Sequence, residues 1–236
     1  ILYYEHTALL KSLFRNHERH GRILKTISRT KGGVTRVELA RQPEIGDGEP
    51  LTKALKELEQ CGFIRKYTNY TKAKSGFYFQ LIDPFIMFSF RFLENREHHD
   101  WMQYINSQSY YAWAGNAFEL VVLLHTNQVK QTLGISGVES REYAWRSEKS
   151  TPGAQVDLLI DRRDGVVNLC EAKYTREAFE IDAHYADVLN HKISTFANET
   201  DCKSAIHLTL ISVSGIRQNE YRNVVNNEIE LEDLFR

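Results

Sequence analysis

The order of hydrophobic and polar residues predicts that the chain begins with helices. Ile23, Leu24 and Ile27 recur at the spacing of one helix face. Gly32 and Gly33 follow them, and glycine commonly ends a helix because it tolerates a left-handed backbone. We therefore expect a helix that starts near residue 17 and ends before this glycine pair.

Two more helices are predicted downstream. Thr35 and Glu38 have the spacing of a capping box, in which each side chain satisfies a backbone amide of the other residue, so we expect a short helix over 35–42. Segment 49–62 shows one apolar face and a terminal glycine, which predict a third helix: Leu51, Leu55, Leu58 and Gly62.

Two alternating segments, 63–67 and 77–82, flank a polar turn and predict a β-hairpin. Three helices followed by a hairpin make a winged helix-turn-helix, which we expect over residues 1–82. In such modules the third helix usually enters the major groove of DNA, while the hairpin contacts phosphate.

The candidate nucleic-acid-binding residues of this module lie on the hairpin. The predicted third helix carries three acids that would repel phosphate, Glu49, Glu57 and Glu59. The hairpin carries four cations with no acid between them: Arg65, Lys66, Lys72 and Lys74. DNA is therefore one predicted partner. Because many winged helices bind proteins, a protein partner is the alternative.

The rest of the chain predicts a connector and an α/β domain. Residues 83–111 are strongly aromatic and predict a helical connector packed between domains. Over 112–236 the periodicity changes in the order α-β-β-β-α-β, with these segments: 115–135, 141–147, the hairpin 156–175, 176–200 and 204–215.

The hairpin 156–175 carries charges inside its apolar strands, at Asp157, Glu171 and Lys173. If the turn is a three-residue loop with Gly165 in the left-handed conformation, Asp157 stands opposite Glu171. Directly opposed residues share one face of a sheet, so these two carboxylates would repel each other.

The turn type decides whether the two carboxylates meet. A two-residue turn at Asp164 and Gly165 would instead pair Asp157 with Ala172, and the shared face would be lost. If the carboxylates do meet, a positive charge must lie between them. Either Mg²⁺, which prefers hard oxygen ligands, or the ammonium group of Lys173 could supply that charge.

The composition adds an asymmetry of charge. The net charge of the 236 residues is −1, but residues 1–82 hold 15 Lys and Arg against 8 Asp and Glu, whereas the remainder holds 15 against 23. The basic part could attract nucleic acid or the acidic part of the same chain. No apolar stretch approaches the roughly 18 residues that span a membrane, and no signal-peptide pattern is present. Three widely spaced cysteines fit a reducing cytoplasm: Cys61, Cys170 and Cys202.

Four residues in order resemble a nuclease motif. Gly115-x-x-Phe118-Glu119, then Asp157 on an apolar strand and Glu171-x-Lys173 on the next, resemble the PD-(D/E)XK superfamily. The resemblance covers about residues 112–214 and implies a restriction-endonuclease-like fold. It also implies that Asp157 and Glu171 hold Mg²⁺, that Lys173 orients water or stabilises the transition state, and that Glu119 supports the metal.

The whole chain is similar to the C-terminal part of a bacterial and archaeal family of AAA+-type ATPases, on phrases such as "YAWRSEKSTPGAQVDLLIDR" and "NLCEAKY". In that family an ATP-binding domain precedes the winged helix. No G-x-x-x-x-G-K-[ST] phosphate loop occurs in this sequence, and it begins at Ile1. We therefore expect a fragment of a longer protein, whose upstream ATPase domain is a partner and carries the ATP site.

Three functions remain open at this point. The first is a Mg²⁺-dependent nuclease that hydrolyses phosphodiester bonds of DNA. The second is a non-catalytic module, in which the nuclease-like fold is a scaffold for the ATPase. The third is a DNA-binding regulator that acts through the winged helix. The predicted helix over 176–200 also offers His184, Tyr185, His191 and Lys192, to which the motif assigns no role.

Overall fold

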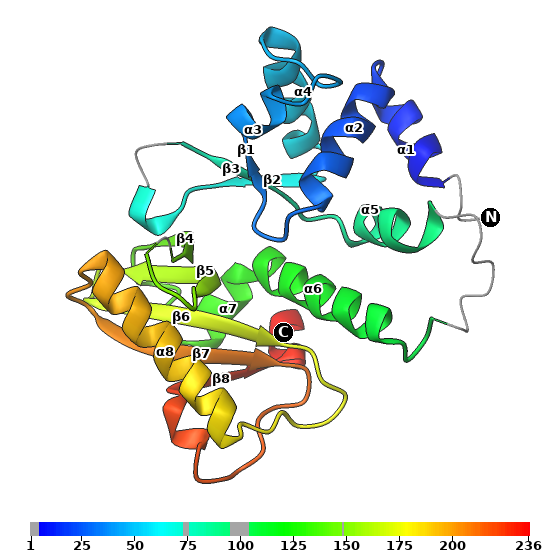
Figure 1. Ribbon diagram of the computed structural model, residues 1–236. Coiled ribbons are helices and arrows are strands. Elements are labelled where there is room, and N and C mark those ends of the chain that lie inside the picture. The colour runs from blue at the N-terminus through cyan, green and yellow to red at the C-terminus, as the bar shows by residue number, and fades with distance from the viewer. Residues whose placement is uncertain (1–4, 73–75, 95–103, 148) are drawn as a thin grey trace. The chain divides into compact units, whose positions relative to one another are not determined.

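The computed structural model describes residues 5–72, 76–94, 104–147 and 149–236 (Figure 1). It is a mixed α/β structure with two separate sheets. The chain divides into two compact units: the N-terminal unit comprises Ile1–Thr68 and Lys74–Leu120, and the C-terminal unit comprises Asn69–Ala73 and Val121–Arg236. No helix among the described residues is both long and apolar enough to cross a membrane.

The N-terminal unit combines helices with a small antiparallel sheet of order β1-β3-β2. Its strands are β1 (Val34–Thr35), β2 (Ile64–Tyr67) and β3 (Tyr78–Leu81). Its helical elements are α1 (Glu5–Leu13), α2 (His17–Ser28), α3 (Arg36–Ala40), α4 (Glu49–Gln60), α5 (Pro84–Phe88), the π-helical turn η3 (Ser89–Leu93) and most of α6 (Gln108–Leu124).

The predicted helices over this unit are confirmed, and one was missed. Thr35 and Glu38 form both halves of the capping box at the start of α3. The leucine face of α4 is buried, as are the apolar residues of α2. The hairpin strands β2 and β3 pair as expected. Helix α1 was not predicted, because among its nine residues only Leu10 is buried.

The C-terminal unit contains a five-stranded sheet of order β4-β5-β6-β7-β8. The β4–β5 and β5–β6 pairs are antiparallel, whereas β6–β7 and β7–β8 pair in parallel. The elements are α7 (Thr126–Thr132), β4 (Ser140–Arg146), β5 (Gln155–Arg162), β6 (Val166–Lys173), α8 (Ala183–Thr200), β7 (Ala205–Ser212), β8 (Asn227–Glu230) and the 3-10 turns η2 (Tyr70–Lys72), η5 (Arg222–Val224) and η6 (Leu231–Phe235).

Two details of the predicted element order were wrong. The single helix expected over 115–135 is two helices, since the chain breaks at His125 between α6 and α7. The strand β8 adds a fifth strand after β7, which had been expected to be the last. Strand β8 has four residues, of which only Ile229 is buried, so its apolar pattern is too short to predict a strand.

The register of the β5–β6 hairpin matches the three-residue loop. Gly165 has a φ of +83°, and the pairing places Leu158 opposite Cys170 and Asp161 opposite Val167. The two-residue turn would shift every pair by one and is excluded. The pairing ends at Leu158 and Cys170, one residue short of Asp157 and Glu171. On the other side of β5 the register with β4 shifts between Tyr143 and Trp145, whose partners are Leu159 and Val156.

Helix α8 lies across one face of this sheet (Figure 1). A buried apolar cluster joins the helix to that face. It includes Leu159, Leu169 and Leu210 from the strands and Leu189 and Phe196 from α8. Because side chains alternate along a strand, Glu171 occupies the same face of β6 as Leu169. Glu171 therefore lies on the face that α8 covers, where it contacts Tyr185 and Lys192.

Candidate functional site

Glu171 is the centre of a polar cluster near the end of β6. The phenol of Tyr185 donates to its Oε1 at 2.9 Å, and the ammonium group of Lys173 lies 3.2 Å from the same oxygen. The ammonium group of Lys192 donates to Oε2 at 2.5 Å. The side chains of Glu171 and Lys192 are each only 14% exposed, so this ion pair is largely shielded from water.

The surroundings of Glu171 favour its ionised form. Burial of the carboxyl group favours the neutral acid, but the ammonium groups of Lys192 and Lys173 outweigh burial, so the pKa of Glu171 lies below its ordinary value. The hydrogen bonds from Lys192 and Tyr185 act in the same direction. The site thus contains a shielded carboxylate that is anionic near neutral pH.

Asp157 lies on β5, the strand that pairs with β6. Its side chain is half-buried, and the amide of Gln155 donates to its Oδ1 at 2.7 Å. Lys173 lies on the neighbouring strand, and its ammonium group is 4.6 Å from the centre of the Tyr185 ring. The ring can hold this ammonium group by a cation–π interaction while it also contacts Glu171.

Helix α8 is anchored so that one of its faces meets Glu171. The carboxylate of Asp182 caps the helix by accepting a hydrogen bond from the amide of Tyr185. Tyr185 and Lys192 are seven residues apart, so they lie two turns apart on one side of the helix. Their common face explains how both reach the same carboxylate.

The loop before β5 is fixed to the other end of α8. The hydroxyl groups of Ser147 and Ser150 each donate to Glu199 Oε1 at 2.6 Å. The ring of His191 lies 3.0 Å from the carbonyl oxygen of Pro152. These contacts fix the segment that leads to Asp157. The contact of His191 is with the backbone of this loop, so its role there is structural.

Within the C-terminal unit, the structure brings Lys173 into contact with Glu171 and places Asp157 on the neighbouring strand β5. Glu119 belongs to the part of α6 that lies in the N-terminal unit, where its carboxylate is 2.7 Å from the ammonium group of Lys31. Its predicted support of the metal therefore stays a prediction.

Sequence reasoning gave no role to the two residues of α8 that contact Glu171. Tyr185 and Lys192 were only two of four polar candidates on that helix, and their seven-residue spacing was the available signal. His184, another of the four, is exposed to solvent.

The donor set fits a hard divalent cation without completing a cage. Among the residues that the structure describes, no three His, Cys, Asp and Glu side chains form a group that could hold a metal ion. Mg²⁺ commonly binds through one or two carboxylates and takes its other oxygen ligands from water and substrate phosphate. Asp157 and Glu171 lie on the paired strands β5 and β6, and the ionised state of Glu171 suits that mode of binding.

Two of the four hairpin residues predicted to bind DNA, Arg65 and Lys66, contact other side chains of the N-terminal unit. The guanidinium group of Arg65 donates to Gln80 at 2.7 Å, and the ammonium group of Lys66 lies 3.6 Å from the centre of the Phe77 ring. The side chain of Lys72 and the whole of Lys74 lie outside the described residues. Their role in DNA binding therefore stays a prediction.

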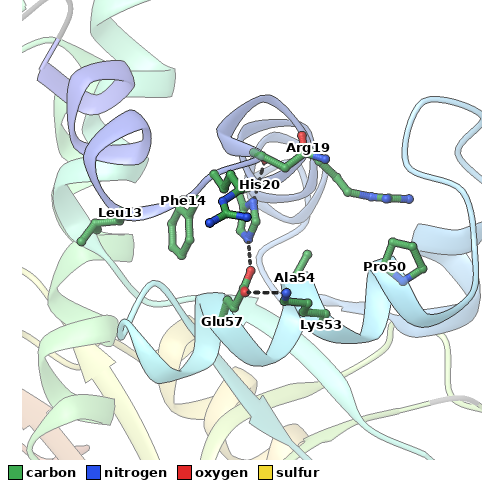
Figure 2. Close-up of a pocket in the computed structure, with 10 residues that line it drawn as sticks. Leu13, Phe14, Arg19, His20, Pro50, Lys53, Ala54 and Glu57 are labelled. Carbon is green, nitrogen blue, oxygen red and sulfur yellow. Dashed lines mark hydrogen bonds and ion pairs between the residues drawn. The ribbon is translucent and has the colours of Figure 1, made fainter.

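A separate hollow of about 520 Å³ lies between α2 and α4 in the N-terminal unit (Figure 2). His20 and Glu57 point toward each other there, with His20 Nε2 2.9 Å from the carboxylate. Nδ1 of the same ring donates to the carbonyl oxygen of Asn16 at 2.8 Å. The ring stacks on Phe14 at a centroid distance of 4.0 Å. His20 is almost fully buried, so this pair joins two helices as a structural contact.

Comparisons with family models, curated proteins and solved structures found no match to this chain. Function must therefore be argued from the residues themselves.

Proposed function

We propose that the C-terminal unit is a restriction-endonuclease-like domain that hydrolyses phosphodiester bonds of DNA with Mg²⁺. In this proposal the N-terminal unit is a winged helix-turn-helix that helps to hold DNA, and the chain is the C-terminal part of an AAA+-type ATPase. The ATPase relationship rests on the sequence resemblance alone.

The observation that carries the proposal is the contact between Lys173 and Glu171 on β6, beside the strand that carries Asp157. The ammonium group of Lys173 lies 3.2 Å from Glu171, and Asp157 lies on β5, which pairs with β6. Two acids and a lysine on adjacent strands can bind a hard cation and an anionic substrate group.

Each residue has a distinct task in this proposal. Asp157 and Glu171 would hold Mg²⁺, which supplies Lewis-acid polarisation of the scissile phosphate and lowers the pKa of a bound water. Lys173 would orient that water or stabilise the additional negative charge of the transition state. Gln155 would fix the Asp157 carboxylate through the hydrogen bond that its amide donates at 2.7 Å.

The test is a cleavage assay on double- and single-stranded DNA with Mg²⁺ or Mn²⁺. We expect Asp157→Asn, Glu171→Gln and Lys173→Ala each to lower the rate about 100-fold or more. Asp164→Asn serves as the control, because this exposed acid lies in the β5–β6 loop and pairs with Arg162. Equal activity of the wild type and the three site variants would refute the proposal.

A non-catalytic scaffold is the second candidate, and one observation favours it. Glu171 already receives hydrogen bonds from Tyr185 and Lys192, so its charge is compensated within the protein. The scaffold would serve the ATPase without binding metal. Calorimetry with Mn²⁺ separates the two candidates. Binding that Asp157→Ala removes favours the nuclease, whereas the scaffold is favoured if neither the folded wild type nor a folded Lys192→Met variant binds Mn²⁺.

DNA binding by the hairpin can be tested apart from cleavage. In a gel-shift assay, Lys72→Glu with Lys74→Glu should weaken binding and reduce its dependence on salt, because fewer counterions are released from phosphate. A shift that these changes abolish, in a protein that never cleaves and is insensitive to Asp157→Ala, would instead indicate a DNA-binding regulator.

A further inference from the structure

Glu171 already contacts positive charge without a metal. Two ammonium groups, those of Lys173 and Lys192, lie 3.2 Å and 2.5 Å from its carboxylate oxygens. A divalent cation would add two positive charges to this small region. Because like charges repel strongly where water is limited, we expect one of the two ammonium groups to move away from Glu171 when the metal binds.

The geometry distinguishes the two lysines. The ammonium group of Lys173 makes two contacts: it lies 3.2 Å from Glu171 Oε1 and 4.6 Å from the centre of the Tyr185 ring. Lys192 approaches the opposite carboxylate oxygen, Oε2, at 2.5 Å. Oε1 receives both Tyr185 and Lys173, so Oε2 is the oxygen that Lys192 would have to release to a metal.

We propose that Lys192 is a displaceable counter-ion, which neutralises Glu171 in the metal-free protein and competes with a divalent cation for Glu171 Oε2. This inference rests on the proposed function and concerns its regulation. Lysine suits the task because its charge is a compact ammonium group on a flexible stem, which can move while the helix stays in place. Lys192 is thus a positioning residue rather than a catalytic one.

Substitution of Lys192 tests the competition directly. Lys192→Met removes the ammonium group but keeps a stem of similar length, so Mn²⁺ should bind about tenfold more tightly or better in calorimetry. Lys192→Arg keeps the charge and should bind Mn²⁺ much as the wild type does. Lys203→Met is the matched control, because Lys203 is 81% exposed and pairs with Asp201 instead.

A second measurement uses the wild-type chain and avoids any risk that a variant fails to fold. Lysine side chains are acetylated with acetic anhydride, with and without saturating Mn²⁺, and each site is quantified by mass spectrometry. The metal should raise the acetylation rate of Lys192, since the released ammonium group becomes accessible to solvent. The acetylation rate of Lys203 should not change.

The outcomes separate this inference from the proposed function. Tighter Mn²⁺ binding by Lys192→Met supports the competition, including the case in which the wild type binds no Mn²⁺. Equal or weaker binding by Lys192→Met, or unchanged acetylation of Lys192 in the metal-bound wild type, overturns it while the metal site stands. If neither the wild type nor a folded Lys192→Met variant binds Mn²⁺, both the competition and the metal site are refuted.

Discussion

His20 should be one of the most sensitive positions of the N-terminal unit. Its ring is 3% exposed, both ring nitrogens face oxygen atoms, and Phe14 stacks on it with an interplanar angle of 5°. These contacts connect α2 to α4, since Asn16 precedes α2 and Glu57 lies on α4 (Figure 2). We predict that His20→Ala loosens this connection while the C-terminal unit keeps its stability.

The expected cost follows from the contacts that are lost. A neutral hydrogen bond contributes about 0.5–1.5 kcal/mol, and one to a charged group about 1.5–3 kcal/mol. An aromatic stack contributes about 0.5–1.5 kcal/mol beyond the area that it buries. Glu57 is 36% exposed and can turn to water, which limits the penalty for its loss of a partner. Together these give about 3–5 kcal/mol for His20→Ala.

Hydrogen exchange followed by mass spectrometry measures this cost locally. Peptides from α2 and α4 should lose protection that corresponds to about 3–5 kcal/mol of opening free energy, whereas peptides from β5 to β7 should not change. Glu57→Gln keeps an acceptor for the ring and should cost about 1 kcal/mol. His184→Ala is the matched control, because this histidine is exposed and lies on α8.

A loss of protection of less than about 1 kcal/mol in α2 and α4 of His20→Ala would refute the prediction, because a single hydrogen bond already contributes about that much. Equal loss of protection in both units would also contradict it. The second result would mean that the substitution acts on the whole chain rather than on the contact between these two helices.

Three further predictions concern backbone conformation, thiol reactivity and pH. Both Gly33 and Gly165 have positive φ, but only at Gly33 would a Cβ collide with a neighbouring backbone carbonyl. In chemical denaturation, Gly165→Ala should therefore lower the free energy of unfolding by about 1 kcal/mol, and Gly33→Ala should lower it by more. In the folded protein a disulfide thiol reagent should modify the exposed Cys61 and spare Cys170, whose pKa burial raises to about 12. Burial also raises the pKa of Tyr70 to about 12, so Tyr70→Phe should remove a late step from the absorbance titration of the tyrosines. The neutral phenol contributes stability in full below its unfolded pKa near 10, and this contribution should be lost as pH rises through about 12.

Local patterns in the sequence predicted the parts of the fold that depend on neighbouring residues. The capping box of Thr35 and Glu38 and the leucine face of α4 need only a few residues to be recognised. The β5–β6 register was left open between two turns, because a left-handed Gly165 suits both; the observed strand pairing selects the three-residue loop.

Tertiary contacts decided the rest. Tyr70 lies in the segment that was expected to be a polar turn, yet its ring packs against Tyr143 and Phe196 in the C-terminal unit. No periodic pattern signals such a contact, because the residues are far apart in sequence. The same reason hid Lys192, whose partner Glu171 is 21 residues away on another element.

The charges inside the β5–β6 hairpin can now be connected to both stability and function. A buried carboxylate such as Glu171 is costly unless a counter-charge and hydrogen bonds accompany it, and Lys192 and Tyr185 supply these from α8. If the pair were only structural, removal of Lys192 would lower stability and bring no gain in metal affinity. If the ammonium group of Lys192 instead occupies the position at Glu171 where a divalent cation would bind, Lys192→Met should lower the stability of the metal-free protein and raise its affinity for Mn²⁺. Opposite changes in these two quantities would show that the same contact stabilises the empty site and restrains its occupation.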